Sequence, residues 1–321
     1  MGYLLRAPAR AMGGSVVAHV VVVHGIGQEY VGPESLELSI APGLRDGIRL
    51  AQGRDSAADL VTVACASYGH LFLASDTRSW SLPPWDETDV EEGLEAELLM
   101  AWWEQAARVD RAVTGPDEPG TLGGAAYGAS RLLLSDRVRA ALDALSGSRY
   151  FGYVSDRMLI FALKQVRRYM TEPELRSAAQ AQVAALVSDD TRVLVGHSLG
   201  SVVAYEALCA HPKWPVTDLI TLGSPLGIRR MIFDRLDPSP VQGVGVWPGG
   251  VRRWTNIADP GDIVALVDRL ADRFGARVQD HRITNGVRMH DLLRYLTAVT
   301  TGRTVAEALS GPTGRTVAGV Q

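Results

Sequence analysis

The sequence feature that most constrains the fold is a short apolar run, residues 191–195, which leads into a Gly-His-Ser-Leu-Gly motif. The run has the β-branched composition of a buried strand, and a helix-forming stretch begins at Leu199. A serine between a strand and a helix predicts a tight turn that presents the Ser198 hydroxyl at the end of the strand. Small residues are needed where helix and strand approach each other, and Gly196 and Gly200 meet that need. The helix N-terminus would direct free N–H groups at negative charge developing beside Ser198.

Further strand-like runs on both sides of this motif indicate an α/β architecture. A near-continuous β-branched run at residues 16–23 is typical of a central strand covered on both faces. The helical pattern that follows, residues 33–54, should kink or break at Pro42-Gly43. A strand–helix–strand unit of this kind places its two strands parallel. The strand-like runs lie at residues 16–23, 60–66, 191–196, 218–222, 252–258 and 276–284. We therefore expect a mostly parallel sheet of about six strands flanked by helices.

The chain departs from this alternation between the second and third strand-like runs. About a hundred residues separate them, which exceeds any ordinary crossover connection. Helical patterns in this stretch lie at residues 88–111, 130–145 and 150–170. We expect a core formed by residues 1–69 and 171–321, with residues 70–170 inserted as a helical cap over the active site.

The order of these motifs resembles that of the α/β-hydrolase superfamily, and in particular its lipase-like and serine-esterase-like members. The resemblance covers residues 16–69 and 171–300. It is carried by His24-Gly25-Ile26 after the first strand, Gly196-His197-Ser198-Leu199-Gly200 at the turn, and Thr221-Leu222-Gly223-Ser224-Pro225 on the following strand. No pair of strand-like runs precedes residue 16, so the family's sheet is shortened here. The resemblance implies a serine, an acid and a histidine in that order, and an oxyanion hole formed by the backbone N–H groups of Ile26 and Leu199.

The resemblance places the acid just after the strand that ends near Ala258, where two aspartates are candidates. Asp262 is favoured because the Asp-Ile-Val segment that it begins resembles the segment that carries the acid in lipase-like members. Asp259 is the alternative acid, although it could instead shape the Pro-Gly turn or cap the following helix. The base belongs after the final strand, where His290 fits. His281 lies inside the strand pattern and is expected to be structural.

Other residues near these motifs receive supporting roles. His197 and His24 are expected to support the serine turn and the oxyanion loop, as residues at these positions do in the family. The candidate substrate contacts are His70, which lies beside the cap, together with Tyr68 and Leu226.

Composition narrows the classes of function. The net charge is −4, so bulk electrostatics give no indication of a nucleic-acid or anionic-membrane partner. Cys65 and Cys209 lie in apolar patterns and are expected to be buried free thiols. The first residues lack the pattern of a signal peptide, and the apolar run at residues 16–23 is too short to span a bilayer. No cluster of His, Cys or carboxylates has metal-ligand spacing. We expect a cytoplasmic protein without membrane insertion, metal or cofactor.

These inferences predict a serine hydrolase that cleaves a small-molecule carboxylic ester or thioester, with an apolar acyl group beneath the cap. In one alternative an alcohol or amine captures the same acyl-enzyme, which would make the protein an acyltransferase or cyclase. In another the chain is a non-catalytic binding module on the same scaffold. The ordered serine, acid and histidine argue against a binding module.

Overall fold

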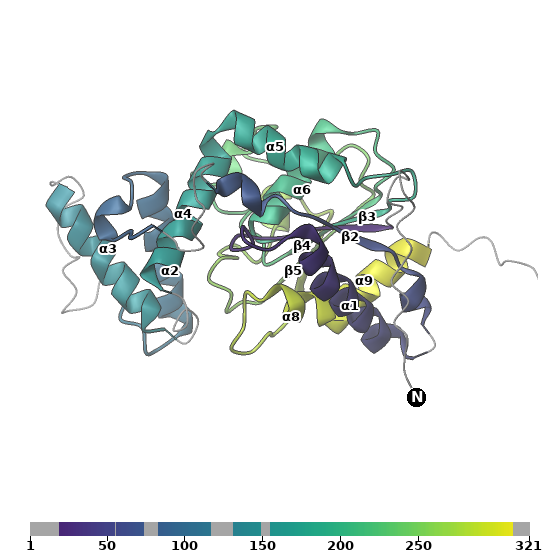
Figure 1. Cartoon of the computed structure of the whole chain (residues 1–321), viewed down its shortest axis with the longest axis horizontal. Helices are drawn as coiled ribbons and strands as arrows, with labels where there is room; N and C mark the ends of the chain where they lie inside the picture. The colour runs from purple at the N-terminus through teal and green to yellow at the C-terminus, as the bar shows by residue number, and fades with distance from the viewer. Residues whose placement is uncertain (1–18, 55, 74–82, 117–130, 149–154, 311–321) are drawn as a thin grey trace, which may run out of the picture.

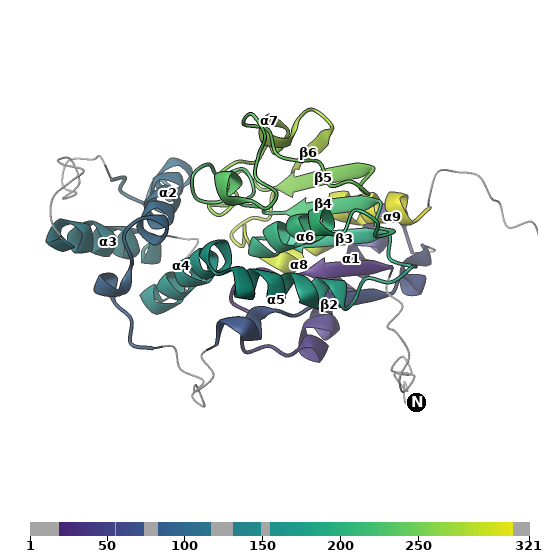
Figure 2. The same cartoon turned by 90° about the horizontal axis from the view of Figure 1, so that it is seen from above.

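The computed structural model of the chain describes residues 19–54, 56–73, 83–116, 131–148 and 155–310. Its centre is a six-stranded sheet in which every strand runs parallel to its neighbours. The strands are β1 (Val20–Val23), β2 (Val63–Ala66), β3 (Val193–His197), β4 (Asp218–Leu222), β5 (Arg253–Ala258) and β6 (Val278–Arg282). Their spatial order is β2-β1-β3-β4-β5-β6, so the chain reverses direction across the sheet between β2 and β3 (Figure 2). The predicted α/β class and parallel sheet are confirmed.

Helices cover both faces of the sheet. One face is covered by α1 (Pro33–Gln52), α8 (Leu292–Thr297) and α9 (Val299–Ser310), and the other by α5 (Pro173–Ala184) and α6 (Leu199–Ala210) (Figure 1). In β1, Val20 and Val22 pack in the first of these layers, Val21 and Val23 pack in the second, and all four are fully buried. Neither face of β1 meets water, which explains its near-continuous apolar sequence. Among the described helices, none has the length and apolar character needed to cross a bilayer.

The helix α1 runs as one element through Pro42-Gly43, so the break expected there does not occur. Pro42 lacks an N–H group and leaves the carbonyl of Leu38, four residues earlier, without its intrahelical partner. Both residues lie on the solvent-facing side, where Leu38 is 79% exposed and water can satisfy that carbonyl. On the opposite side, Gly43 and Gly47 pack closely against α8, and this packing supports the helix.

Substitution of Gly47 by alanine is expected to destabilise the fold by about 1–3 kcal/mol, although alanine favours a helix more than glycine does. The added methyl group would overlap the main-chain carbonyl oxygen of Leu296, which cannot move unless α8 shifts. Gly43→Ala is the matched control, because its methyl group would meet side-chain atoms alone, the nearest being the end of the flexible Leu293 side chain, 3.1 Å away. Urea unfolding should give a lower midpoint for the Gly47 variant than for the Gly43 variant. Equal midpoints would contradict this account of the packing.

Between β2 and β3 the chain forms a further helical layer, which we call the helical insertion. It consists of α2 (Leu94–Val109), α3 (Arg131–Ser146) and α4 (Asp156–Thr171). The insertion lies beyond the carboxyl ends of the strands, and α4 leads from it back to α5 at the sheet (Figures 1 and 2). The helix expected from Thr88 starts six residues later, after a 3-10 turn and after Gly93, whose φ is +88°. Residues 16–18 and 150–154, which belong to predicted elements, lie outside the described residues.

Candidate active site

The site lies where the order of the strands reverses, at the carboxyl ends of β1 and β3. The connections from these two neighbouring strands leave in opposite directions, which opens a crevice where α/β proteins commonly bind ligands. The loop after β1 begins at His24, and Ser198 directly follows β3. The fold therefore places the two predicted halves of the site next to each other.

Ser198 occupies the turn between β3 and α6 in an unusual backbone conformation. Its φ is +52° and its ψ is −132°, a combination that non-glycine residues rarely adopt and that costs about 1–3 kcal/mol. The Ser198 N–H donates to the Leu222 carbonyl at 3.0 Å, and the Ser201 hydroxyl donates to the Ser198 carbonyl at 2.6 Å. Only 2% of Ser198 is exposed. The Gly-His-Ser-Leu-Gly motif thus forms a strained strand-to-helix turn held by its surroundings.

The two glycines of the motif allow the strand and the helix to approach each other. A methyl group on Gly196 would lie 2.5 Å from the Ser201 Cα, at the start of α6. A methyl group on Gly200 would overlap the carbonyl oxygens of Val23 and His24, at the end of β1. Both obstacles are main-chain atoms, so a side chain at either position would displace the turn or the loop after β1.

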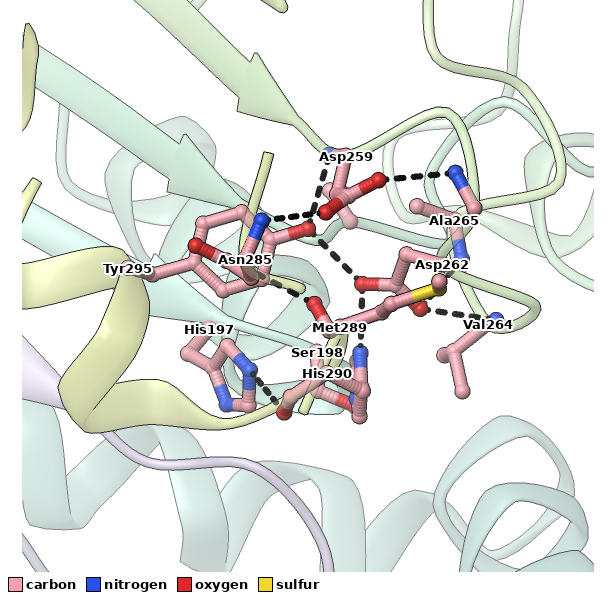
Figure 3. A network of polar contacts seen from close by, with 12 residues as sticks. His197, Ser198, Asp259, Asp262, Val264, Ala265, Asn285, Met289, His290 and Tyr295 are labelled. Atoms are coloured by element: carbon pink, nitrogen blue, oxygen red, sulfur yellow. Dashed lines mark hydrogen bonds and ion pairs between the residues drawn. The ribbon is translucent and has the colours of Figure 1, made fainter. Parts of the chain in front are cut away.

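His290 and Asp262, from the loops that follow β6 and β5, form a hydrogen-bonded pair (Figure 3). The His290 Nδ1 lies 2.8 Å from Oδ2 of the fully buried Asp262. The Tyr295 hydroxyl donates to the same oxygen at 2.8 Å. The N–H groups of Val264 and Ala265 donate to Oδ1 at 3.0 and 3.4 Å. Both carboxylate oxygens are therefore engaged, which fixes the orientation of Asp262 toward His290.

This contact determines which nitrogen of His290 carries the proton. A carboxylate only accepts hydrogen bonds, so Nδ1 donates, and Nε2 of the neutral imidazole is left with a free lone pair. His290 Nε2 is buried and has no hydrogen-bond partner among the described residues. Leaving a buried polar atom unpaired is costly for a fold. It is also the arrangement that a proton acceptor in a reaction requires.

The turn that carries Ser198 lies beside His290, although Ser198 and His290 are not hydrogen-bonded in the described structure. The ring of His197, the residue before Ser198, has its centroid 4.6 Å from that of His290. The His197 Nε2 donates to the His290 carbonyl oxygen at 3.1 Å (Figure 3). Burial lowers the pKa of His197 well below its ordinary value, so this ring is a neutral support. Hydrogen bonds between a nucleophile and its base are often long without substrate and shorten when it binds.

Asp259, the alternative acid, has other partners. Its Oδ1 accepts a hydrogen bond from the Gly261 N–H at 2.8 Å, and its Oδ2 accepts one from the Asn285 N–H at 2.5 Å. The Asp259 N–H donates to the Tyr295 hydroxyl at 3.0 Å. In the described structure Asp259 makes no hydrogen bond to His290. It shapes the turn after β5 and ties that turn to the loop that leads to His290.

The peptide bond that carries the Ile26 N–H is held by His24. The Tyr68 N–H donates to His24 Nε2 at 3.1 Å, so the ring proton lies on Nδ1, which donates to the Gly25 carbonyl oxygen at 2.6 Å. In a trans peptide the C=O and the following N–H point in opposite directions, so this bond turns the Ile26 N–H away from His24. The Tyr68 ring stacks on His24 with a centroid separation of 4.4 Å.

Two main-chain N–H groups near Ser198 are available. Leu199 is the first residue of α6, where an N–H has no intrahelical acceptor. Within the described residues, neither its N–H nor that of Ile26 donates a hydrogen bond. Gly25 packs directly on Ser198, since a methyl group there would lie 2.7 Å from the Ser198 Cβ. The two predicted oxyanion donors therefore belong to segments that meet at Ser198.

The candidate substrate contacts lie in different environments. Tyr68 is buried, and its hydroxyl donates to the His24 carbonyl at 2.9 Å, so it supports the loop after β1. Leu226 is fully buried in the hydrophobic core. His70 is exposed on a 3-10 turn, η2 (Gly69–Phe72). His281 is exposed on β6, where it was expected to be structural.

Two residues that contact the site escaped sequence analysis. Tyr295 supports Asp262, and burial, together with the nearby Asp262 charge, raises its pKa, so the hydroxyl stays protonated and donates. Gln165, in α4, accepts a hydrogen bond at 3.3 Å from the Gly27 N–H in the loop after β1. The only local signal for Gln165 is a polar residue on the buried face of an amphipathic helix. Tyr295 carries no such signal, because a tyrosine fits an ordinary buried helix face.

The free energy of unfolding is expected to decrease as the pH falls from 6.5 toward 4 because of His24. Burial, the largest cause, lowers the pKa of His24 from 6.5 to about 4. Between these values the unfolded chain binds a proton that the folded chain does not, so acid favours unfolding. This group alone should remove about 3 kcal/mol of stability across that range, and its full contribution is present above pH 6.5.

Urea unfolding across this pH range tests that expectation. His24→Gln should flatten the pH dependence in part, because the buried His197 contributes with the same sign. His281→Gln is the matched control, since the same substitution at an exposed position removes no burial cost. An identical pH slope in the wild type and in His24→Gln would contradict the assignment.

Within the described residues, no group of three or more His, Cys, Asp or Glu side chains could hold a metal ion. Cys65 and Cys209 are both free thiols, the first buried and the second half-buried. No protein-family model matches the chain, and no curated protein or solved structure matches it significantly.

Proposed function

We propose that the chain is a serine hydrolase of the α/β-hydrolase type that cleaves a carboxylic ester or a thioester. The observation that carries this proposal is the His290 ring, whose Nδ1 is held by Asp262 and whose buried Nε2 is unpaired within the described structure. It stands beside the strained turn of Ser198. A serine hydroxyl is a weak nucleophile that needs a base, and the base needs an orienting acid. These three residues supply those roles.

The reaction would proceed through an acyl-enzyme. The Ser198 Oγ attacks the carbonyl carbon while His290 Nε2 takes the hydroxyl proton. The carbonyl oxygen becomes an oxyanion, stabilised by the N–H groups of Ile26 and Leu199 and by the N-terminus of α6. The C–O or C–S bond then breaks, and the leaving alkoxide or thiolate receives the proton from His290. Water, deprotonated by the same nitrogen, attacks the acyl-enzyme. The bond between the acyl carbon and Ser198 Oγ then breaks, the acid is released, and His290 returns the proton to the serine oxygen.

The apolar acyl group remains a prediction from the content of the helical insertion. The two tryptophans that contribute to that content, Trp102 and Trp103, are buried inside the insertion and pack in its core. A series of p-nitrophenyl esters of increasing chain length would reveal the acyl preference directly.

A fluorophosphonate probe tests the proposal without knowledge of the natural substrate. Phosphonylation requires an activated serine and an oxyanion hole, so the wild type should be labelled at Ser198 and Ser198→Ala should not be labelled. Ser148→Ala is a useful control and should be labelled like the wild type, because Ser148 is also a buried serine but its hydroxyl donates to the Leu145 carbonyl, at the end of α3. Labelling of Ser198→Ala equal to that of the wild type would overturn the proposal. Product analysis with a competing alcohol or amine then separates hydrolysis from acyl transfer.

A further inference from the structure

A buried glutamine connects the helical insertion to the oxyanion loop. Gln165 lies in α4, is only 1% exposed, and belongs to a helix face whose other buried members are mostly apolar. A buried amide needs hydrogen-bond partners, since leaving it unpaired costs free energy. Gln165 has a donor and an acceptor as partners, and both lie in the loop after β1. Its Oε1 accepts from the Gly27 N–H at 3.3 Å, and its Nε2 donates to Glu29 Oε2 at 3.2 Å.

The contact with Gly27 acts on the peptide that follows Ile26. His24 holds the peptide before Ile26 through the Gly25 carbonyl, and Gln165 holds the peptide after it through the Gly27 N–H. The two peptide planes together set the φ and ψ of Ile26, and so the direction of its N–H. Gly27 has a φ of +80°, a conformation that glycine adopts readily and that its chain neighbours alone do not impose. An external partner is therefore needed to fix this part of the loop.

Glu29 is the second partner of Gln165, and it accepts a hydrogen bond where Gly27 donates one. Its side chain is nearly fully buried, and burial, as the largest cause, raises the pKa of its carboxyl group. The Gln165 amide donates to this buried carboxyl group, in addition to the hydrogen bond that the carboxyl group accepts from the Glu29 main chain. The pair is thus specific in direction: a donor from α4 meets an acceptor from the loop, while an acceptor from α4 meets the main-chain donor of Gly27.

The same helix also holds the neighbouring turn. The Arg168 side chain donates to the Phe72 carbonyl at 3.0 Å, and its guanidinium lies over the Phe72 ring at 5.8 Å. The turn that ends at Phe72 packs on the oxyanion loop, because a methyl group on Gly69 would lie 2.7 Å from the Gln28 carbonyl carbon. The helix α4 therefore contacts both segments that surround Ile26.

We propose that Gln165 is a positioning residue through which the helical insertion holds the oxyanion loop in its catalytic shape. The role rests on the proposed function, because it acts on the N–H that would bind the oxyanion. It makes the insertion part of the catalytic machinery and not only a cover that selects substrates. Gln165 touches neither Ser198 nor His290 within the described structure, so it acts on the reaction only through the loop.

Gln165→Leu removes both contacts with little change in volume. It should increase amide hydrogen exchange in residues 24–29 and slow phosphonylation of Ser198 by about 10- to 100-fold, as expected when an oxyanion donor is misplaced and not removed. With an ester substrate the loss should fall on kcat more than on KM. Gln180→Leu is the matched control, because Gln180 also donates to a buried carboxylate, Glu206, at 3.2 Å, but lies on α5. It should leave both measurements unchanged.

Exchanging the donor and the acceptor between Gln165 and Glu29 tests whether the hydrogen bonds, and not only the packing of the side chain, position the loop. Gln165→Glu keeps the acceptor for Gly27 but places a carboxylate against Glu29, so it should be impaired like Gln165→Leu. Adding Glu29→Gln restores a donor–acceptor pair in the opposite direction, and the double variant should recover the phosphonylation rate to within about threefold of the wild type. A double variant as slow as Gln165→Glu alone would overturn the proposal.

Amide hydrogen exchange and the labelling rate together distinguish a failure of the positioning role from a failure of the proposed hydrolase function. If the wild type is not labelled at all, the hydrolase proposal fails, and with it the catalytic role of Gln165. If labelling is normal and Gln165→Leu changes neither the exchange of residues 24–29 nor the labelling rate, only the positioning role fails. Faster exchange with an unchanged labelling rate would likewise overturn it, since the loop would then move without consequence for the reaction.

Discussion

Ser198→Ala is expected to lower kcat for an ester substrate by about 10⁶-fold, the loss seen when a triad nucleophile is removed. His290→Ala should cost nearly as much, because without Nε2 as a base the serine is left protonated. The double variant should be no slower than either single variant, since the two residues act as one unit and the first substitution already removes the whole pathway. Turnover can be measured with a chromogenic ester at saturating concentration.

A residual rate should survive in all three variants. The N–H groups of Ile26 and Leu199 remain in place, and binding with an oxyanion hole alone still accelerates hydrolysis about 10³- to 10⁴-fold over water. A residual activity that disappears on titration with a fluorophosphonate would instead indicate contaminating wild-type enzyme. Losses in the two single variants that multiply in the double variant would show that Ser198 and His290 act independently, which contradicts the proposed mechanism.

The sheet could be predicted from the sequence because its central strands, β1, β3 and β4, are covered on both faces. A strand such as β1, in which all four side chains are buried, has no polar face to interrupt its apolar run. The course of α1 could not be predicted in the same way. Pro42 breaks a helix when its surroundings are buried, but here the unpaired carbonyl faces solvent. Which side of a helix faces water depends on the tertiary packing, in this case on α8 and α9.

The turn at Ser198 could also be predicted, because its motif is a continuous run of five residues, from Gly196 to Gly200. The acid could not be assigned in this way, since Asp259 and Asp262 follow the same strand and are only three residues apart. The two aspartates differ in their contacts with distant segments: Asp259 accepts a hydrogen bond from the main chain of Asn285, and Asp262 faces His290. Gln165 contacts a loop 138 residues away in the chain, so no local pattern could reveal its role.

Asp262→Asn is expected to lower kcat by about 10⁴-fold through a change of tautomer. The Val264 N–H donates to Oδ1 of the aspartate, so the oxygen of the asparagine amide should occupy that position. Its NH₂ group then takes the place of Oδ2 and faces His290 Nδ1. Because an NH₂ group donates, Nδ1 must accept, and the ring proton moves to Nε2. His290 then presents a donor to Ser198 and cannot take its proton.

Asp259→Asn is the control that distinguishes the two aspartates. Both oxygens of Asp259 accept hydrogen bonds from main-chain N–H groups, so the asparagine NH₂ group must face one of those donors. This should destabilise the fold by about 1–3 kcal/mol, measured by urea unfolding, because a buried donor loses its acceptor. The kcat should fall by no more than about tenfold, since the Asp262–His290 pair remains intact. A loss of kcat that is larger in Asp259→Asn than in Asp262→Asn would reassign the acid. A large loss of kcat in both variants would have a different meaning. It would show that the tautomer of His290 also depends on Asp259, which ties the turn after β5 to the loop that leads to His290.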